Sequence, residues 1–223
     1  MRMRRKKNIV KRIEDCSRYL TVMCESEKDS RVVSTDKLID FNEFFGNGNP
    51  VVLEIGCGKG GFACELAKRN PDINVLAVEK SDNVIVAGCE KAREEGLHNI
   101  KFICSGAEYL ERYIKPCSIS RLYLNFSCPY PKSKYANHRL TAKRFLSIYK
   151  NLLMDDAEIH QKTDNKGLFE FSIEQLSDFG YTIKNVSLDL HNSNFEGNIM
   201  TEYEARFTAL GQPIYRLEAY IKN

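Results

Sequence analysis

The chain has 223 residues, of which 43% are hydrophobic and 28% are charged, and its formal net charge is +3. This length and balance suit a globular protein with a sizeable core and exclude a disordered or fibrous chain. No apolar run approaches the roughly 18 residues that a membrane span needs, and no hydrophobic segment with a cleavage site follows the basic N-terminus. We therefore expect a cytoplasmic protein.

The first part of the chain predicts an arm followed by one large domain. Residues 1–33 are polar and basic with weak periodicity, which is typical of a partly flexible arm, and residues 34–223 are expected to form the domain. Hydrophobic periodicity predicts helices over 35–45, 62–69, 82–95 and 108–114. Apolar runs predict strands over 51–55, 74–79, 100–104 and 121–126.

The same alternation continues to the C-terminus. Helices are expected over 142–153, 168–179 and 201–210, and strands over 158–162, 182–190 and 214–221. Alternating strands and helices favour an α/β fold with a doubly wound, mostly parallel sheet of seven strands. The last two strands can close a hairpin, so we expect one antiparallel strand at an edge.

The eight cysteines do not form a recognisable framework. No CxxC pair occurs, and four of the cysteines fall in segments predicted as core elements: Cys57, Cys64, Cys89 and Cys104. We interpret them as reduced thiols and expect no metal site.

Charge is distributed unevenly along the chain. Residues 1–12 hold seven Lys/Arg and no acid, residues 112–154 hold nine and no acid, and residues 155–223 hold twelve acids against six bases. Tyr130 and Tyr135 lie within the second basic block, where rings can stack on bases while cations hold phosphates. The pattern favours a nucleic-acid partner, although a solvated tail and a lysine-rich loop would give the same counts.

A glycine-rich loop joins the first predicted strand of the domain to a helix. It contains Glu54, Gly56, Gly58 and Gly60, and glycines here let a ligand approach the backbone and the amides of a helix N-terminus. The letters also satisfy GxGxxG, so a dinucleotide site or a tight structural turn stays open. The acid two residues before the first glycine favours S-adenosylmethionine, because a carboxylate can orient its amino acid end.

The next two strand ends fit a nucleoside. Glu79 closes the second strand, where a carboxylate can accept hydrogen bonds from both ribose hydroxyls, unless it is a solvated acid. The segment Ser105-Gly106-Ala107-Glu108 follows the third strand, where an adenine ring would rest.

Three separated motifs carry a family resemblance. They are Ser127-Cys128-Pro129-Tyr130-Pro131-Lys132 after the fourth strand, the segment from Ile159 to Glu170, and the segment from Asn198 to Glu204. Together they closely resemble the bacterial tRNA (guanine-N7)-methyltransferase family, from about Val51 to the C-terminus. The resemblance implies a Rossmann-like, class I S-adenosylmethionine-dependent methyltransferase fold, with methyl transfer to N7 of a guanine in the tRNA variable loop.

The resemblance also implies roles for residues. The cofactor is expected at the glycine loop and the strand ends, through Glu54, Gly56, Gly58, Gly60, Glu79, Gly106, Ala107 and Asn125. The tRNA is expected at Lys132, Lys134, Arg139, Asp164, Thr201, Glu202, Tyr203 and Glu204. Acids among these can stabilise a cationic product guanine, while a capped helix start and surface acids would also account for them. The number of subunits is left open between monomer and homodimer.

The chain departs from the family at the residue expected to be catalytic. Cys128 stands where the family carries an aspartate, and Gly106 stands where it usually carries an acid. A neutral thiol cannot replace a carboxylate as acceptor. We therefore keep an alternative, a homologue that binds tRNA and S-adenosylmethionine with weak or lost transfer. A base amino-methyltransferase and a nicotinamide-dependent oxidoreductase are further, less favoured, alternatives.

Overall fold

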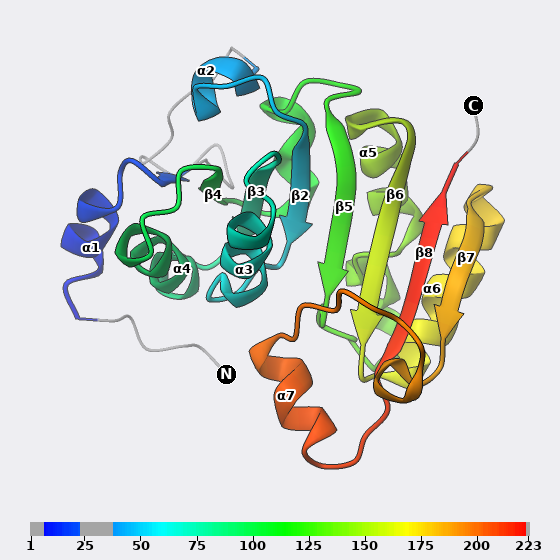
Figure 1. The fold of residues 1–223 in the computed structure, drawn as a ribbon. Coiled ribbons are helices and arrows are strands. Elements are labelled where there is room, and N and C mark those ends of the chain that lie inside the picture. Colours follow the sequence, from blue (N-terminus) through cyan, green and yellow to red (C-terminus); the bar gives the residue numbers. More distant parts are fainter. Residues whose placement is uncertain (1–6, 23–37, 222–223) are drawn as a thin grey trace. The chain divides into compact units, whose positions relative to one another are not determined.

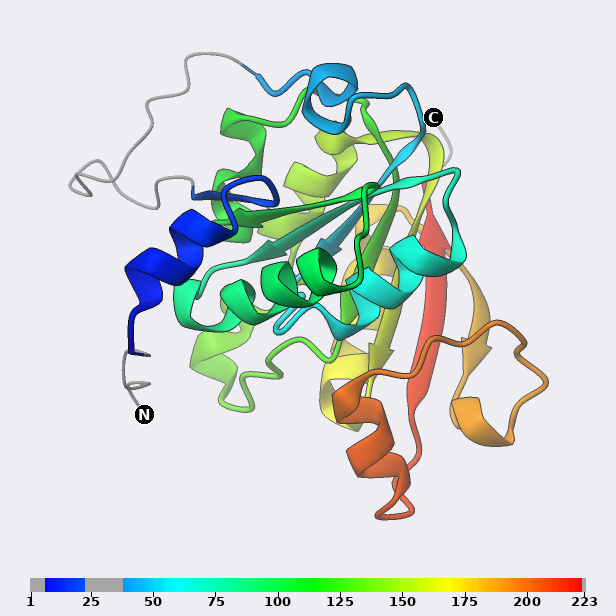
Figure 2. The same ribbon diagram turned by 60° about the vertical axis from the view of Figure 1, so that its left-hand side comes forward.

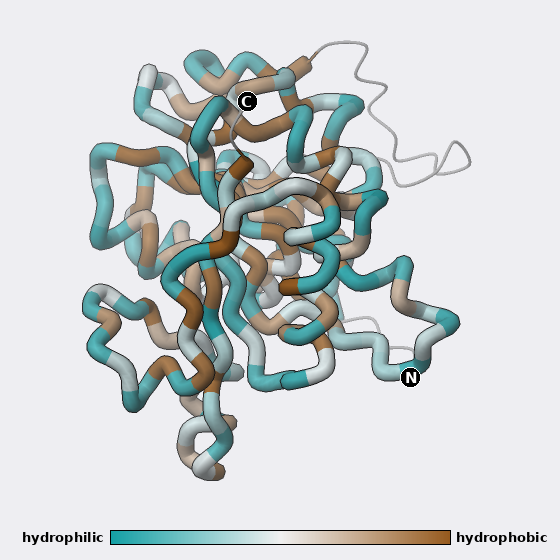
Figure 3. Tube along the Cα trace, turned by 90° about the vertical axis from the view of Figure 1, so that its right-hand side faces the viewer, coloured by the Kyte–Doolittle hydropathy of each residue, from teal (hydrophilic) through white to brown (hydrophobic). Residues whose placement is uncertain are grey.

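The computed structural model describes residues 7–22 and 38–221 (Figure 1). The chain divides into two units, unit 1 up to Tyr113 and unit 2 from Ile114 onward. Hydrophobic residues alternate with hydrophilic ones along much of the chain (Figure 3), as expected of elements with one buried face. None of the helices in the described part is long and apolar enough to span a membrane.

Unit 1 is built on four parallel strands in the order β1-β4-β3-β2. The strands are β1 (Leu20–Val22), β2 (Val51–Ile55), β3 (Asn74–Glu79) and β4 (Ile100–Cys104). Every residue of β2 is buried, as expected for a strand covered on both faces. The helical elements are α1 (Ile9–Asp15), α2 (Phe41–Phe45), α3 (Gly61–Arg69), α4 (Asp82–Glu94) and the 3₁₀ helix η1 (Ala107–Arg112).

Part of the predicted arm is folded. α1 buries Ile9, and the Arg12 guanidinium donates to both carboxylate oxygens of Glu90 on α4, at 2.6 and 2.5 Å. β1 then pairs with β4 and widens the sheet, so the prediction of an arm is wrong for residues 9–22. A strand of three residues is too short for periodicity to reveal. Residues 1–6 and 23–33 of the predicted arm lie outside the described residues.

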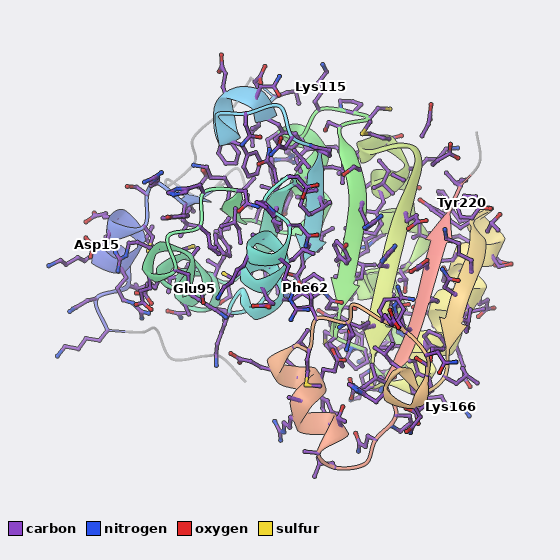
Figure 4. All side chains as sticks on the ribbon, in the orientation of Figure 1. Asp15, Phe62, Glu95, Lys115, Lys166 and Tyr220 are labelled. Carbon is purple, nitrogen blue, oxygen red and sulfur yellow. The ribbon has the colours of Figure 1, made fainter. Side chains whose placement is uncertain are left out.

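Unit 2 holds β5 (Ile119–Asn125), β6 (Leu153–Thr163), β7 (Thr182–Ser187) and β8 (Tyr215–Tyr220). β5 and β6 are parallel, and β8 runs antiparallel to both β6 and β7. In Figure 4, Lys166 just after β6 and Tyr220 at the end of β8 mark opposite ends of this sheet. The predicted antiparallel strand is therefore present, one position inside the edge. With β1, the described residues contain eight strands, one more than predicted.

Helices α5 (Lys143–Leu152) and α6 (Lys166–Phe179) cover one face of the unit 2 strands (Figure 1). A buried chain of hydrogen bonds joins them to the sheet: the hydroxyls of Thr141 and Ser172 lie 2.8 Å apart, and the Gln161 amide donates to Ser172. The remaining helical elements are η2 (Ser133–His138), η3 (Leu190–Asn192) and α7 (Glu202–Thr208). α7 lies beyond the end of the sheet at which β5 and β6 finish (Figures 1 and 2).

Candidate active site

The glycine loop between β2 and α3 is anchored at its start and open further on. The amides of Gly56 and Cys57 both donate to the Val78 carbonyl, at 2.8 and 3.0 Å, which ties the loop to the end of β3. Gly56 and Gly58 have φ of +81° and +57°, and a Cβ at either position would meet nothing within 4 Å. The predicted cofactor positions Gly56 and Gly58 therefore border open space, which fits a ligand lying against the loop.

Gly60 serves the packing of the loop. A Cβ at this position would lie 2.9 Å from the Gly88 Cα and 3.0 Å from the Phe102 ring, and φ is +71°. The missing side chain lets α4, which carries Gly88, approach the loop over β4. The sequence predicted Gly60 as a cofactor residue, and the structure places it at this helix contact.

The two predicted carboxylates of unit 1 converge near Cys57. Glu54 and Glu79 lie at the ends of paired, parallel strands, with Glu54 2% exposed and Glu79 half-buried. Burial raises the pKa of the Cys57 thiol well above its usual value, and the charges of Glu54 and Glu79 raise it further. Glu79 also accepts a hydrogen bond from the Ser81 amide at 3.0 Å. Two acids beside an open glycine loop suit the amino group and the ribose hydroxyls of S-adenosylmethionine.

An acid is present at the third strand end, contributed by a residue that the sequence analysis did not choose. Gly106 and Ala107 are buried and follow β4 after Ser105, and the Glu108 carboxylate lies against Gly106. A Cβ at Gly106 would lie 2.6 Å from Glu108 Oε2. The Glu108 carboxylate therefore takes up the room that an acidic side chain at position 106 would need. The sequence feature that could have indicated this role is the position of Glu108, two residues after Gly106.

In unit 2, β5 ends in a loop whose backbone is strained. Asn125, a predicted cofactor residue, is the buried last residue of β5. Phe126 and Tyr130 follow with φ of +49° and +41°, a region that residues other than glycine rarely adopt. Cys128 lies between them and is exposed. Strained residues concentrate at functional sites, which agrees with the expected place of the substrate loop.

The basic run over residues 132–139 contains exposed lysines and one half-buried arginine. Lys132 and Lys134 are exposed, and the Lys134 ammonium lies 5.0 Å from the centroid of the Tyr135 ring. Tyr130 and Tyr135 both contact His138, with ring centroids 5.5 and 6.0 Å apart. Exposed cations among aromatic rings suit a nucleic-acid surface. Arg139 is half-buried and turned toward the loop backbone.

Asp164 follows β6 and is half-buried. The adjacent Asn165 caps α6 by accepting from the Leu168 amide at 2.8 Å, so the capping role falls to Asn165. Among the residues that the structure describes, none forms a hydrogen bond or ion pair with the Asp164 carboxylate. Its oxygens are therefore available to accept from a guanine.

Thr201 and Glu204 form a capping box at the start of α7, with the Glu204 amide donating to Thr201 Oγ1 at 2.9 Å. Glu204 is fully buried, and its Oε2 accepts from the Lys162 ammonium at 2.7 Å. Its Oε1 accepts from the Asn198 amide, and His191 Nε2 lies 3.0 Å away. Lys162 and Asn198 lie within two of the motifs of the resemblance, but the sequence analysis gave them no role, because no local pattern shows which cation a distant acid will meet.

The other predicted α7 residues are exposed. Tyr203 is 61% exposed, and its ring stacks on Phe126 with 6.4 Å between centroids. Phe207 continues the stack beyond Tyr203 at 6.5 Å. Glu202 is exposed beside it. These contacts bring the α7 motif next to the loop after β5.

A second cluster of ionisable groups lies on the sheet of unit 2. Ligand atoms of Glu158, His160 and Glu218 lie within 4.8 Å of one another. Glu158 is paired with Lys184 and with His160, at 2.7 Å, while Glu218 is bound by Arg216 and Asn185. Cations of the protein already balance both carboxylates, so this donor set does not fit a metal ion.

Comparison with known proteins places the fold and the family. The family described as "Putative methyltransferase" matches residues 48–217. A solved structure of a 16S rRNA methyltransferase, KamB, superposes with a TM-score of 0.63 at 16% identity, covering 83% of this chain and 95% of that one. The protein is thus a methyltransferase with the Rossmann-like fold expected from the sequence.

Two curated relatives identify the family more closely. A protein of Bacillus cytotoxicus named tRNA (guanine-N(7)-)-methyltransferase is 44% identical over 98% of this chain and 96% of its own length. The Bacillus subtilis (strain 168) protein of the same name is 48% identical over 80% of this chain and 84% of its own. The chain belongs to the tRNA (guanine-N7)-methyltransferase family, which confirms the resemblance drawn from the three motifs.

Proposed function

We propose that this protein methylates N7 of a guanine in the variable loop of tRNA, with S-adenosylmethionine as the methyl donor. The observation that carries the proposal is the identity of 44% with a relative of that name over 98% of the chain. The open glycine loop beside Glu54 and Glu79, and the exposed cations and rings of unit 2, support it.

Unit 1 would hold the cofactor through carboxylates that accept hydrogen bonds from its donor groups. Glu54 accepts from its amino group, Glu79 accepts from its ribose hydroxyls, and Glu108 accepts from the adenine amino group. When bound, S-adenosylmethionine supplies an electrophilic methyl group on a sulfonium centre.

Unit 2 would hold the base. Guanine N7 carries a free lone pair at neutral pH, so no side chain has to remove a proton, and positioning dominates the catalysis. Tyr203 offers a ring for stacking, and Asp164 accepts from the ring N–H and amino group of guanine. The product guanine is cationic, and the negative charge of Asp164 stabilises it. Lys132 and Lys134 neutralise phosphates of the tRNA.

The exposed thiol of Cys128 favours a second candidate function, a tRNA-binding and S-adenosylmethionine-binding homologue with weak transfer. A cysteine has one weak acceptor where an aspartate has two oxygens. Loss of one electrostatic contact of this kind lowers turnover by roughly 10- to 1000-fold.

The first experiment incubates the protein with methyl-labelled S-adenosylmethionine and an unmodified tRNA transcript, and maps the label. Wild type, Cys128→Asp and Cys128→Ala are compared. We expect N7-methylguanine in the variable loop with wild type, and faster turnover with Cys128→Asp. Binding of tRNA with transfer only by Cys128→Asp would establish the second function instead. Methylation only at another atom of the tRNA would exclude both.

A further inference from the structure

Arg139 differs from the other cations of its basic run in what it contacts. Its Nε donates to the Pro129 carbonyl at 3.0 Å, and its Nη2 donates to the Tyr130 carbonyl at 3.1 Å. One face of the guanidinium covers the Phe171 ring of α6, 4.4 Å from the centroid. The guanidinium of Arg139 therefore connects two consecutive carbonyls of the loop to helix α6.

The backbone of Arg139 gives this fork a fixed base. Its amide donates to the Ala136 carbonyl at 3.0 Å, and its carbonyl accepts from the Ala142 amide at 2.9 Å. Arg139 thus stands at the junction of η2 and α5, close to the buried contact between the Thr141 and Ser172 hydroxyls. The Arg139 side chain therefore links the loop to the packed pair of helices, beside the ring contact between Tyr130 and His138.

The loop segment that Arg139 binds, Pro129 and Tyr130, has a strained backbone that has to be stabilised by its surroundings. Tyr130, with φ of +41°, lies between two prolines, which have no amide hydrogen to donate. A non-glycine residue in this region persists only where its surroundings hold it. The two carbonyls that Arg139 binds lie on either side of the strained Tyr130 Cα.

We propose that Arg139 is a positioning residue that holds the loop 127–132 in its strained form, and that it does not serve as a phosphate contact for tRNA. The inference rests on the proposed function, because the loop matters through the base that it places. It assigns the tRNA charge contacts of this run to the exposed Lys132 and Lys134.

The test compares Arg139→Lys and Arg139→Gln with wild type. Lysine keeps the charge but cannot span two carbonyls with a planar fork. We expect both variants to lose roughly 10- to 100-fold in kcat, as a small displacement of reacting groups does, while the Kd for tRNA changes less than about twofold. A phosphate contact predicts the opposite: Arg139→Lys close to wild type, and Arg139→Gln weakened in affinity.

Salt dependence separates the two roles further. A residue that neutralises one phosphate contributes close to one unit to the slope of log Kd against log salt concentration. We expect Arg139→Gln to leave the slope unchanged and the matched control Lys134→Gln to lower it by about one. A lower slope with Arg139→Gln would overturn the proposal.

Hydrogen exchange of the protein without tRNA supplies a readout that does not depend on activity. We expect the amides of Phe126 and Tyr135, which donate to the Lys162 and Lys132 carbonyls at the two ends of the loop, to exchange at least several-fold faster in Arg139→Gln, with α5 and α6 peptides and the unfolding temperature unchanged. Unchanged exchange in the loop would also overturn the proposal. If wild type transfers no methyl group, the proposed function fails, and the exchange measurement still decides whether Arg139 holds the loop.

Discussion

At the scale of single residues, burial decides what a carboxylate can do. Glu202 and Glu204 belong to one short motif, yet Glu202 is exposed and Glu204 is fully buried. Glu204 is the only buried residue of α7, and Lys162, which binds it, is only 6% exposed. The helix is therefore held by an ion pair where most helices are held by an apolar face. We infer that Glu204 acts by placing Thr201 and Tyr203.

Removing the Glu204 charge should destabilise the protein. Glu204→Gln leaves the Lys162 ammonium buried beside a neutral group, and breaking a buried pair of this kind costs about 3 kcal/mol. Denaturant unfolding checks this, with the exposed neighbour Glu202→Gln as control, for which we expect a change within about 0.5 kcal/mol. Equal stability of Glu204→Gln and wild type would show that the pair does not hold α7.

At the scale of elements, glycines of the loop between β2 and α3 have two different roles, ligand access and helix packing, which the sequence pattern does not distinguish. Gly56 and Gly58 border open space, whereas Gly60 allows α4 to approach. The pattern E-x-G-x-G-x-G predicted the strand, the loop and the helix correctly. It could not assign Gly60 to packing, because its neighbours Gly88 and Phe102 come from elsewhere in the chain.

Substitution of two adjacent glycines should test the packing role of Gly60. Gly60→Ala places a Cβ 2.9 Å from the Gly88 Cα and keeps φ positive, so we expect a loss of about 2 to 3 kcal/mol. Gly61→Ala is the matched control, since its Cβ meets nothing within 4 Å, and we expect a change below about 0.5 kcal/mol. Thermal unfolding of the two variants measures the difference, and similar losses would contradict the packing role.

At the scale of the whole molecule, stability should depend on pH through the cluster on the unit 2 sheet. Burial lowers the pKa of His160, while the Glu158 carboxylate partly opposes this shift. Burial acts against ionisation of Glu158, but hydrogen bonds from Lys184 and His160 lower its pKa to about 2. Both groups bind protons more readily in the unfolded chain, so stability falls as pH decreases.

The pH window follows from these directions. Loss begins below pH 6.5, where His160 becomes protonated in the unfolded chain, and continues below 4.5 as Glu158 does the same. We expect the free energy of unfolding to decrease between pH 7.5 and 5.5 in wild type, and a flatter profile in His160→Asn. The exposed His98→Asn serves as control and should follow wild type. A wild-type slope in His160→Asn would contradict the assignment.

The sequence by itself determined most of the elements of the domain and the family. Periodicity located β3 and β4 at their observed limits and α3, α5 and α6 within two residues, because apolar spacing reflects which face is buried. The helix predicted over 35–45 is present only as α2, Phe41–Phe45; the prediction is wrong for residues 38–40, which are not helical, and residues 35–37 lie outside the described part of the chain. Three motifs sufficed for the family, because each is a run of adjacent residues.

Only the tertiary structure decided what several site residues contact. Arg139 was predicted on the tRNA side, and its guanidinium donates to loop carbonyls. Glu204 was also predicted there, and its carboxylate accepts from the buried Lys162. Gly106 carries no acid, and the Glu108 carboxylate occupies the space beside it. Each outcome depends on groups brought together by folding, at distances that neither composition nor spacing encodes. The residue type determines which hydrogen bonds and charges a side chain can offer, but the packing of the strands and helices determines which partner it meets.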